Sequence, residues 1–202
     1  MEKPFSPSCE RNKDSILEVL KKLISKEDKF LLEIGSGTGQ HAVHFAPHFE
    51  HLKWVTSDRF VNFEGIKAWL SEAKIPNILG PVQYEVGKSS LPPQKYDLIF
   101  TANTLHIMSW KKVKTLIKQL GQYLVEGTQI IIYGPFNFNN EFTSESNKIF
   151  NEVLKQNDDQ AGIRNFEDIV SVMNKNGIEF TEKFEMPANN FILVFTKIEK
   201  IK

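Results

Sequence analysis

The chain has 202 residues, of which 41% are hydrophobic and 25% are charged. This composition is typical of a folded globular domain and excludes general disorder. The 25 Lys and Arg residues balance the 25 Asp and Glu residues, so no whole-protein field attracts nucleic acid or an anionic membrane.

The single cysteine, Cys9, excludes an intrachain disulfide framework and a cysteine-rich zinc module. The start of the chain lacks the apolar core of a signal peptide, and no apolar run is long enough to span a bilayer. We therefore expect a cytoplasmic protein without nucleic-acid or membrane partners.

Strand-like and helix-like segments alternate along the chain, which predicts one layered α/β sheet. In chain order the expected elements are a helix over 14–24, a strand over 30–34, a helix over 40–45, a strand over 52–57, a helix over 60–73, strands over 81–86 and 96–101, a helix over 110–124, a strand over 129–133, helices over 147–155 and 166–175, and strands over 178–185 and 191–197. Asp14 and Ser109 are the expected N-caps, and Asn165 with Asp168 resembles a capping box. Only five residues separate the last two strands, which predicts an antiparallel hairpin after five strands with helical crossovers.

A glycine-rich turn joins the first expected strand to the next helix, and it reads Glu33-Ile34-Gly35-Ser36-Gly37-Thr38-Gly39. Glycines at this place let the backbone approach a ligand closely. A dinucleotide site has a third small residue where this chain has Gln40. Glu33 would also repel a pyrophosphate, whereas it suits an ammonium group. The turn therefore disfavours a nicotinamide-dependent oxidoreductase.

A second carboxylate, Asp58, ends the next strand, at the place where a carboxylate can accept ribose hydroxyls. A ligand with a ribose, an amino group and no phosphate suits both Glu33 and Asp58. S-adenosylmethionine is such a ligand. The alternative is a tight turn in which Glu33 caps backbone groups or pairs with a lysine.

Residues 29–58 resemble the motifs of the class I S-adenosylmethionine-dependent methyltransferases. This resemblance implies a three-layer, Rossmann-like α/β fold with a seven-stranded, mostly parallel sheet and a C-terminal antiparallel hairpin. A narrower resemblance, to the methyltransferase-like 26 type, a former domain-of-unknown-function family, rests on residues 6–14, 37–46, 133–136 and 186–190. It implies the same fold and cofactor but no established acceptor. We expect a single domain over 1–202, with residues 1–13 as an N-terminal cap segment.

Carried onto this sequence, the class I pattern implies a set of cofactor-binding residues. The set is Glu33, Gly35, Ser36, Gly37, Gly39, Gln40, His41, Asp58, Glu85 and Asn103. Glu33 and the glycines would surround the methionine part of the cofactor, and Asp58 would bind the ribose. Glu85 would lie beside adenine, and Asn103 near the methyl group.

His106 and Asn103 are the candidate catalytic residues because they follow the fourth strand, where the transferable methyl group should point. His106 either acts as a general base or orients an acceptor, or else it packs under the next helix. No metal site is expected. His41, His44 and His48 share one helical face, but no acidic or cysteine partner lies at ligand spacing.

The candidate acceptor-pocket residues come from three segments and are Arg11, Asn12, Tyr133, Phe136, Asn189 and Asn190. Each has a structural alternative. The first two could belong to a solvated helix start, the aromatic pair to the core, and the asparagine pair to turn geometry.

These patterns predict methyl transfer from S-adenosylmethionine to a small-molecule acceptor. Because the leaving thioether is neutral, the protein mainly has to supply proximity, alignment and water exclusion. The 202 residues leave little beyond the core fold, which favours a small acceptor. Two alternatives stay open: a methyltransferase of protein or another macromolecule, and a non-catalytic protein that binds the cofactor or its demethylated product. Nothing in the pattern indicates an oligomeric state.

Overall fold

The computed structural model describes residues 3–199. Residues 1, 2 and 200–202 lie outside the described residues. All five belong to the expected single domain, and residues 1 and 2 also belong to its expected N-terminal cap segment. The chain divides into two compact units, Met1–Thr101 (unit 1) and Ala102–Lys202 (unit 2).

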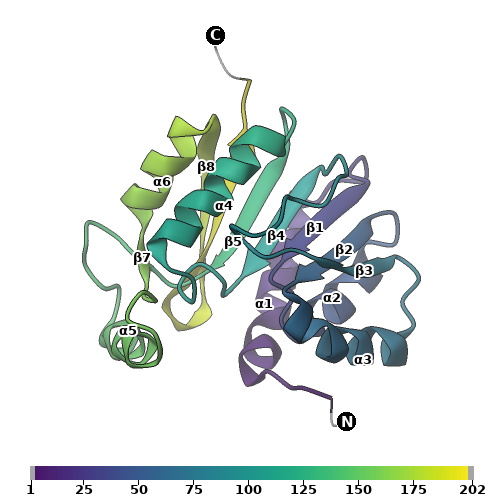
Figure 1. The fold of residues 1–202 in the computed structure, drawn as a ribbon, viewed down its shortest axis with the longest axis horizontal. Helices are drawn as coiled ribbons and strands as arrows, with labels where there is room; N and C mark the ends of the chain where they lie inside the picture. Colours follow the sequence, from purple (N-terminus) through teal and green to yellow (C-terminus); the bar gives the residue numbers. More distant parts are fainter. Residues whose placement is uncertain (1–2, 200–202) are drawn as a thin grey trace. The chain divides into compact units, whose positions relative to one another are not determined.

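Unit 1 is built from parallel strands and three α-helices (Figure 1). Its elements are α1 (Pro7–Leu23), β1 (Phe30–Ile34), α2 (Gln40–Phe45), η1 (Ala46–His48), β2 (Lys53–Asp58), η2 (Phe60–Asn62), α3 (Phe63–Ala73), β3 (Ile78–Gln83) and β4 (Leu98–Ala102). Strand β1 pairs in parallel with β2 and β4, and β2 pairs in parallel with β3. Four of the five β1 residues are buried, as expected for a parallel strand covered on both faces.

Helix α1 begins at Pro7, so the predicted start at Asp14 was wrong. The prediction followed the apolar stripe that begins at Ile16 and ignored the polar turns before it. Pro7 occupies the first turn, and Ser6 Oγ accepts a hydrogen bond from the Cys9 N–H at 3.4 Å. Residues 7–13 of the expected cap segment are therefore helical.

An aromatic cluster packs α2 against the sheet of unit 1. Phe45, Trp54 and Phe100 have ring centroids 5.7–5.9 Å apart in each pair. Such pairs contribute roughly 0.5–1.5 kcal/mol each beyond the burial of their area. A Cβ on Gly39 would lie 3.3 Å from the Ile66 backbone, so a glycine there lets α2 begin close to α3. Both contacts fix the helix that follows the glycine loop.

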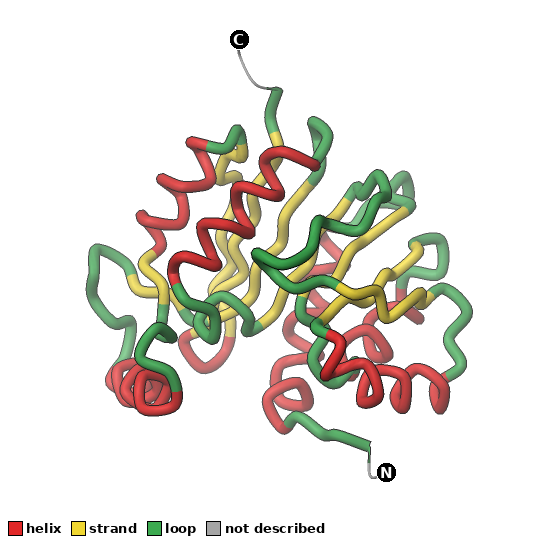
Figure 2. The backbone as a smooth tube through the Cα atoms, in the orientation of Figure 1, coloured by secondary structure: helices red, strands yellow, loops and turns green. Residues whose placement is uncertain are grey.

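Unit 2 contains β5 (Gln129–Gly134), β6 (Phe136–Asn137), β7 (Arg164–Asn165), β8 (Ile178–Met186), β9 (Asn190–Lys197), α4 (Trp110–Tyr123), α5 (Glu145–Asn157), α6 (Phe166–Lys175) and η3 (Pro187–Asn189). Strand β9 pairs antiparallel with both β5 and β8, which confirms the predicted hairpin. Helices α4 and α6 lie side by side (Figure 2). Ser109 caps α4 as predicted, whereas Asn165 makes no side-chain cap to α6, so the predicted capping box was wrong.

The strand order of the main sheet is β3-β2-β1-β4-β5-β9-β8, and β6 and β7 form a separate parallel pair. A seven-stranded, mostly parallel sheet with antiparallel strands at its C-terminal end confirms the predicted α/β fold class. Over residues 3–199, no helix combines the length and the apolar character needed to cross a membrane.

Candidate functional site

The glycine loop follows β1 and leads into α2. Gly35, Gly37 and Gly39 have φ values of 74°, 60° and 89°, in the left-handed region that favours glycine. The N–H groups of Gly35 and Ser36 donate to the Ser57 carbonyl at 2.9 and 3.0 Å, which binds the loop to the end of β2. A Cβ on Gly37 would meet no described atom within 4 Å. The loop is thus fixed at one side and open at Gly37.

Asp58, at the end of β2, holds the same loop. Its Oδ2 accepts from Gly37 N at 2.7 Å, and its Oδ1 accepts from Arg59 N at 2.7 Å and from Asn62 Nδ2 at 2.8 Å. Among the described residues no lysine or arginine forms an ion pair with it. A carboxylate has about four lone-pair sites, so three donors leave capacity for a ligand hydroxyl.

Glu33 belongs to a buried network that the sequence analysis missed. Its side chain is 2% exposed, and Oε2 accepts from Trp54 Nε1 at 2.9 Å. Burial raises the pKa of Glu33 to about 7, against the opposing effect of hydrogen bonds from Trp54 and Ser36. No described lysine or arginine pairs with it. The strand register, with Leu31 opposite Trp54, puts Trp54 and Glu33 on one sheet face, so alternation along the strands was the available signal.

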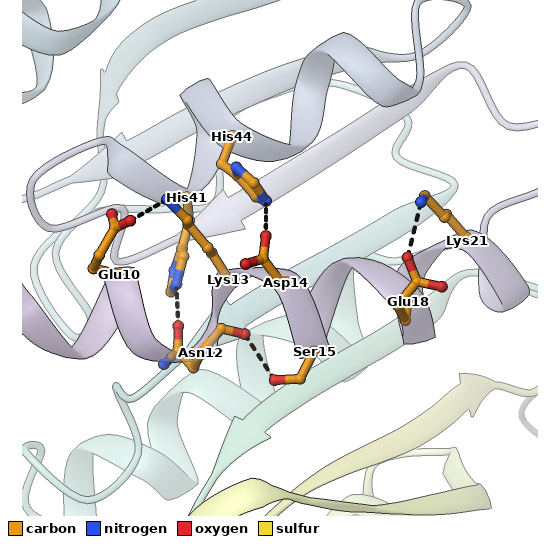
Figure 3. Close-up of polar contacts among 9 residues, drawn as sticks. All are labelled: Glu10, Asn12, Lys13, Asp14, Ser15, Glu18, Lys21, His41 and His44. Carbon is orange, nitrogen blue, oxygen red and sulfur yellow. Dashed lines mark hydrogen bonds and ion pairs between the residues drawn. The ribbon is translucent and has the colours of Figure 1, made fainter.

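The first turn of α2 is bound to α1 (Figure 3). His41 Nε2 lies 2.8 Å from Asn12 Oδ1, and Gln40 Oε1 accepts from Ser6 N at 2.5 Å. Cys9 Sγ lies 4.0 Å from His41 Nδ1. Burial lowers the pKa of His41 to about 4 and raises the pKa of Cys9, so both groups are neutral at pH 7. The structure therefore brings Asn12, Gln40 and His41 together in buried contacts beside the glycine loop.

Two further polar side chains of this helix pair, Arg11 and His44, make contacts farther from the glycine loop. Arg11 is exposed, and its Nη2 donates to Ser8 Oγ at 3.3 Å. His44 Nε2 lies 3.1 Å from Asp14 Oδ1 (Figure 3). Within residues 3–199 there is no group of three or more His, Cys, Asp or Glu side chains that could hold a metal ion.

Glu85 follows the third strand instead of lying within it. Strand β3 covers Ile78–Gln83, so the predicted strand over 81–86 was wrong at both ends. Glu85 Oε1 pairs with Lys88 Nζ at 2.9 Å, and its N–H donates to Ser89 Oγ at 2.7 Å. A place for Glu85 beside adenine stays a prediction.

In unit 2, Asn103 and His106 converge on Gly134. A Cβ on Gly134 would lie 3.8 Å from His106 Nδ1 and 4.0 Å from Asn103 Oδ1. Asn103 has a φ of 57°, and its N–H donates to the Tyr133 carbonyl at 2.9 Å. Asparagine is among the few non-glycine residues that adopt this left-handed conformation readily. Neither the Asn103 amide nor the His106 ring forms a hydrogen bond with another described residue, so both are available to a ligand.

His106 is buried and uncharged at neutral pH. Its side chain is 6% exposed, and burial, assisted by the positive charge of Arg164, lowers its pKa to about 4. The Phe150 ring meets the imidazole edge-on, with centroids 5.4 Å apart. A neutral imidazole in this position can accept or donate one hydrogen bond at each nitrogen, according to its tautomer.

Arg164 holds the loop that carries His106, a role that the sequence analysis missed. The guanidinium donates to the carbonyls of Leu105 and Met108, one on each side of His106. The Gly162 N–H donates to the His106 carbonyl at 2.8 Å. Strand β7, which carries Arg164, has only two residues, too few for a periodic pattern.

The remaining acceptor-pocket candidates lie where a purely structural role, in the core or in a turn, would also place them. Tyr133 and Phe136 are buried in the core of unit 2. Asn190 Nδ2 donates to the Pro187 carbonyl at 3.1 Å, and Asn189 has a φ of 55°, as in a tight turn. Their contribution to an acceptor pocket stays a prediction.

The structure is similar to solved methyltransferases. It matches the mitomycin 7-O-methyltransferase MmcR with a TM-score of 0.80 and 12% identity, over 92% of this chain and 53% of that chain. It matches an O-methyltransferase family 2 protein from Planctomyces limnophilus, solved with apigenin, with a TM-score of 0.80 and 12% identity, over 93% of this chain and 56% of that one. It matches PigF, solved with SAH, with a TM-score of 0.78 and 14% identity, over 89% of this chain and 54% of that one.

At these identities the similarity shows the class I methyltransferase fold alone, and this chain spans just over half the length of the matched proteins. The narrower resemblance to the methyltransferase-like 26 type stays a prediction. A family model matches residues 3–197, and the chain belongs to that family, which is described as "Protein of unknown function (DUF938)".

Proposed function

We propose that this chain transfers a methyl group from S-adenosylmethionine to a small-molecule acceptor. The observation that carries the proposal is the bond between Gly37 N and Asp58 Oδ2, at 2.7 Å. It joins the glycine loop to a carboxylate at the carboxyl ends of adjacent parallel strands, where open α/β sheets bind their ligands. Similar structures solved with SAH and with apigenin support this cofactor and a small acceptor.

The side chains of unit 1 fit a cationic nucleoside without phosphate. The space at Gly37 suits close contact with the methionine part. Asp58 keeps lone-pair capacity for a ribose hydroxyl. Glu33 has no cationic partner among the described residues, and its carboxylate would attract the ammonium group. The other proposed cofactor residues are Gly35, Ser36, Gly39, Gln40, His41, Glu85 and Asn103.

The bound cofactor would supply an electrophilic methyl group, and the residues of the chain would orient the acceptor. His106 and Asn103 are the proposed catalytic residues because their side chains form no hydrogen bond with another described residue and converge on Gly134. The His106 ring, neutral at pH 7, can orient an acceptor by a hydrogen bond at a ring nitrogen. The proposed acceptor-pocket residues are Arg11, Asn12, Tyr133, Phe136, Asn189 and Asn190.

Calorimetric titration of the full chain with S-adenosylhomocysteine tests the proposal. The wild-type chain should bind, and Asp58→Ala should lose roughly 1–3 kcal/mol of binding free energy, the scale of a hydrogen bond to a charged group. Asp97→Ala is the matched control. Asp97 Oδ2 also accepts two backbone N–H groups, from Lys29 at 2.8 Å and Phe30 at 3.0 Å, but at the opposite end of β1. A wild-type chain that does not bind, or equal losses in both variants, would refute the proposal.

A further inference from the structure

Arg164 carries a half-buried positive charge that forms no ion pair with a described carboxylate, and Asp158 acts on it only from a distance. Its guanidinium donates to the carbonyls of Leu105, Met108 and Gln160, while Nη1 makes no hydrogen bond with a described residue. No described Asp or Glu forms an ion pair with it. Asp158, whose charge acts on Arg164 from a distance, instead accepts from Gln160 N at 2.9 Å. A partly buried charge without a counter-ion is unfavourable, so a ligand that supplies one is favoured.

Two polar side chains beside this charge also lack partners. His106, nine-tenths buried, and Asn103 point toward one position above Gly134, at 3.8 and 4.0 Å from a Cβ placed there. The charge of Arg164 reaches His106, since it contributes to the depressed pKa of the imidazole. At this position the imidazole Nδ1, when it carries the proton, can donate to a ligand oxygen, whereas the Asn103 side chain presents its amide oxygen, which accepts.

A partly exposed aromatic ring lies next to His106. Phe150, on α5, meets the His106 ring edge-on at 5.4 Å and is still 38% exposed. Ile149 and Val153, on the same helix, are exposed as well. A ligand that contacts His106 can therefore place a ring against Phe150.

We propose that the acceptor is an aromatic oxyanion, either a carboxylate or an acidic phenolate, whose charge is balanced by Arg164 and whose oxygen is oriented by His106. This inference rests on the proposed function. An acceptor with a protonated amine would be repelled by Arg164. A neutral alcohol would need a base, and an imidazole with a pKa of about 4 is too weak a base for that proton.

Methyl transfer to an oxyanion needs no proton removal. The new O–C bond uses an electron pair that the oxygen already carries, and the electron pair of the broken S–C bond stays on sulfur. The products are a neutral methyl ester or ether and a neutral thioether. His106 is therefore expected to orient the acceptor and to stay neutral throughout.

Binding of paired aromatic probes to the full chain tests this inference. The pairs are 4-hydroxybenzoate against 4-hydroxybenzamide and 4-nitrophenolate against 4-nitroaniline, with affinities measured by saturation-transfer NMR. At least one anion should bind about tenfold or more tightly than its neutral match, as expected for a charge-assisted contact. Arg164→Gln should reduce that ratio to about one, whereas Arg164→Lys should keep part of it because the charge remains. Lys118→Gln, which removes an exposed positive charge elsewhere in unit 2, should leave the ratio unchanged.

The ratio separates charge recognition from a purely structural role of Arg164. If Arg164 only holds the loop, its replacement weakens anionic and neutral probes alike, and the inference is wrong. It is also wrong if the wild-type chain binds no anion or shows no preference for one. Titration with S-adenosylhomocysteine distinguishes failure of this inference from failure of the proposed function. If the chain binds S-adenosylhomocysteine but no anion, this inference is wrong and the proposed function still stands. With S-adenosylmethionine added, an alkali-labile methyl ester identifies the carboxylate and an alkali-stable methyl ether the phenolate.

Discussion

The two units of the chain treat the polar groups of their candidate sites in opposite ways. In unit 1, Asp58 and Glu33 accept hydrogen bonds from their own chain, and Asp58 alone accepts three. In unit 2, the side chains of His106 and Asn103 have no hydrogen-bond partners among the described residues. A loop that must hold one shape needs internal partners, whereas groups that meet an acceptor must remain available. The internal hydrogen bonds of unit 1 therefore indicate that its glycine loop is preorganised. The side chains without hydrogen-bond partners in unit 2 indicate groups that are available to a ligand.

Gly37→Val is expected to have the largest effect and tests whether the loop of unit 1 is shaped for a ligand. The side chain would enter the open space at Gly37, so S-adenosylhomocysteine binding should fall below detection by calorimetry. Gly127→Val is the matched control, because Gly127 has a φ of 85° and open space at its Cβ but lies outside the loop. Both variants should lose about 1–2 kcal/mol of unfolding free energy through backbone strain. Normal cofactor binding by Gly37→Val would break the argument.

The buried carboxyl of unit 1 should make stability depend on pH. Burial raises the pKa of Glu33 to about 7 in the folded chain, from an ordinary value of 4.5. Its contribution is therefore fully present below about pH 4.5 and is lost as the pH rises through about 7. Relative to Glu33→Gln, the wild-type unfolding free energy should fall by on the order of 3 kcal/mol over this range. Urea denaturation at a series of pH values measures this difference, and parallel curves for the two proteins would contradict it.

Asn12→Ala tests how much the hydrogen bond between α1 and α2 stabilises unit 1, without changing the glycine loop itself. It removes the partner of His41 Nε2, and leaving a buried group unpaired should cost about 1–3 kcal/mol of unfolding free energy. Lys22→Ala, at an exposed position of the same helix, should cost little. Equal stability of the two variants, measured by urea denaturation, would show that the contact between α1 and α2 contributes nothing.

The smallest expected effect lies in unit 2. Burial is the main cause of the depressed pKa of His106, and the charge of Arg164 adds to it. Arg164→Gln should therefore raise the pKa of His106 only slightly, because a partly exposed charge is screened by solvent. NMR titration of the ring protons measures the change. If the pKa of His106 does not change, or falls, the charge of Arg164 does not act on the candidate acceptor site.

Much of unit 1 follows from local sequence signals. The apolar run over 30–34 and the glycines after it predict a strand, a turn and a helix, and the structure contains all three at β1, the loop and α2. The early start of α1 was also readable, because Ser6 followed by Pro7 is a strong N-terminal signal. It was passed over because the apolar stripe begins further along the chain.

The cluster in unit 2 depends on contacts that no local pattern encodes. Arg164 reaches Leu105 and Met108 across more than 50 residues of chain, from a strand of two residues. The contact between Trp54 and Glu33 is also distant in sequence, but strand alternation limits where each side chain can point. Contacts set by the register of a sheet are therefore partly predictable, and contacts set by loops are not.

The hydrogen bond from Trp54 to Glu33 gives the chain a built-in optical reporter. Trp54 is fully buried, and its indole N–H donates directly to the carboxyl whose pKa is raised to about 7. A negative charge appearing at this oxygen changes the electric field along the indole ring. The emission wavelength of Trp54 should therefore follow the ionisation of Glu33, and a ligand cation arriving nearby would be visible in the fluorescence of the unlabelled protein.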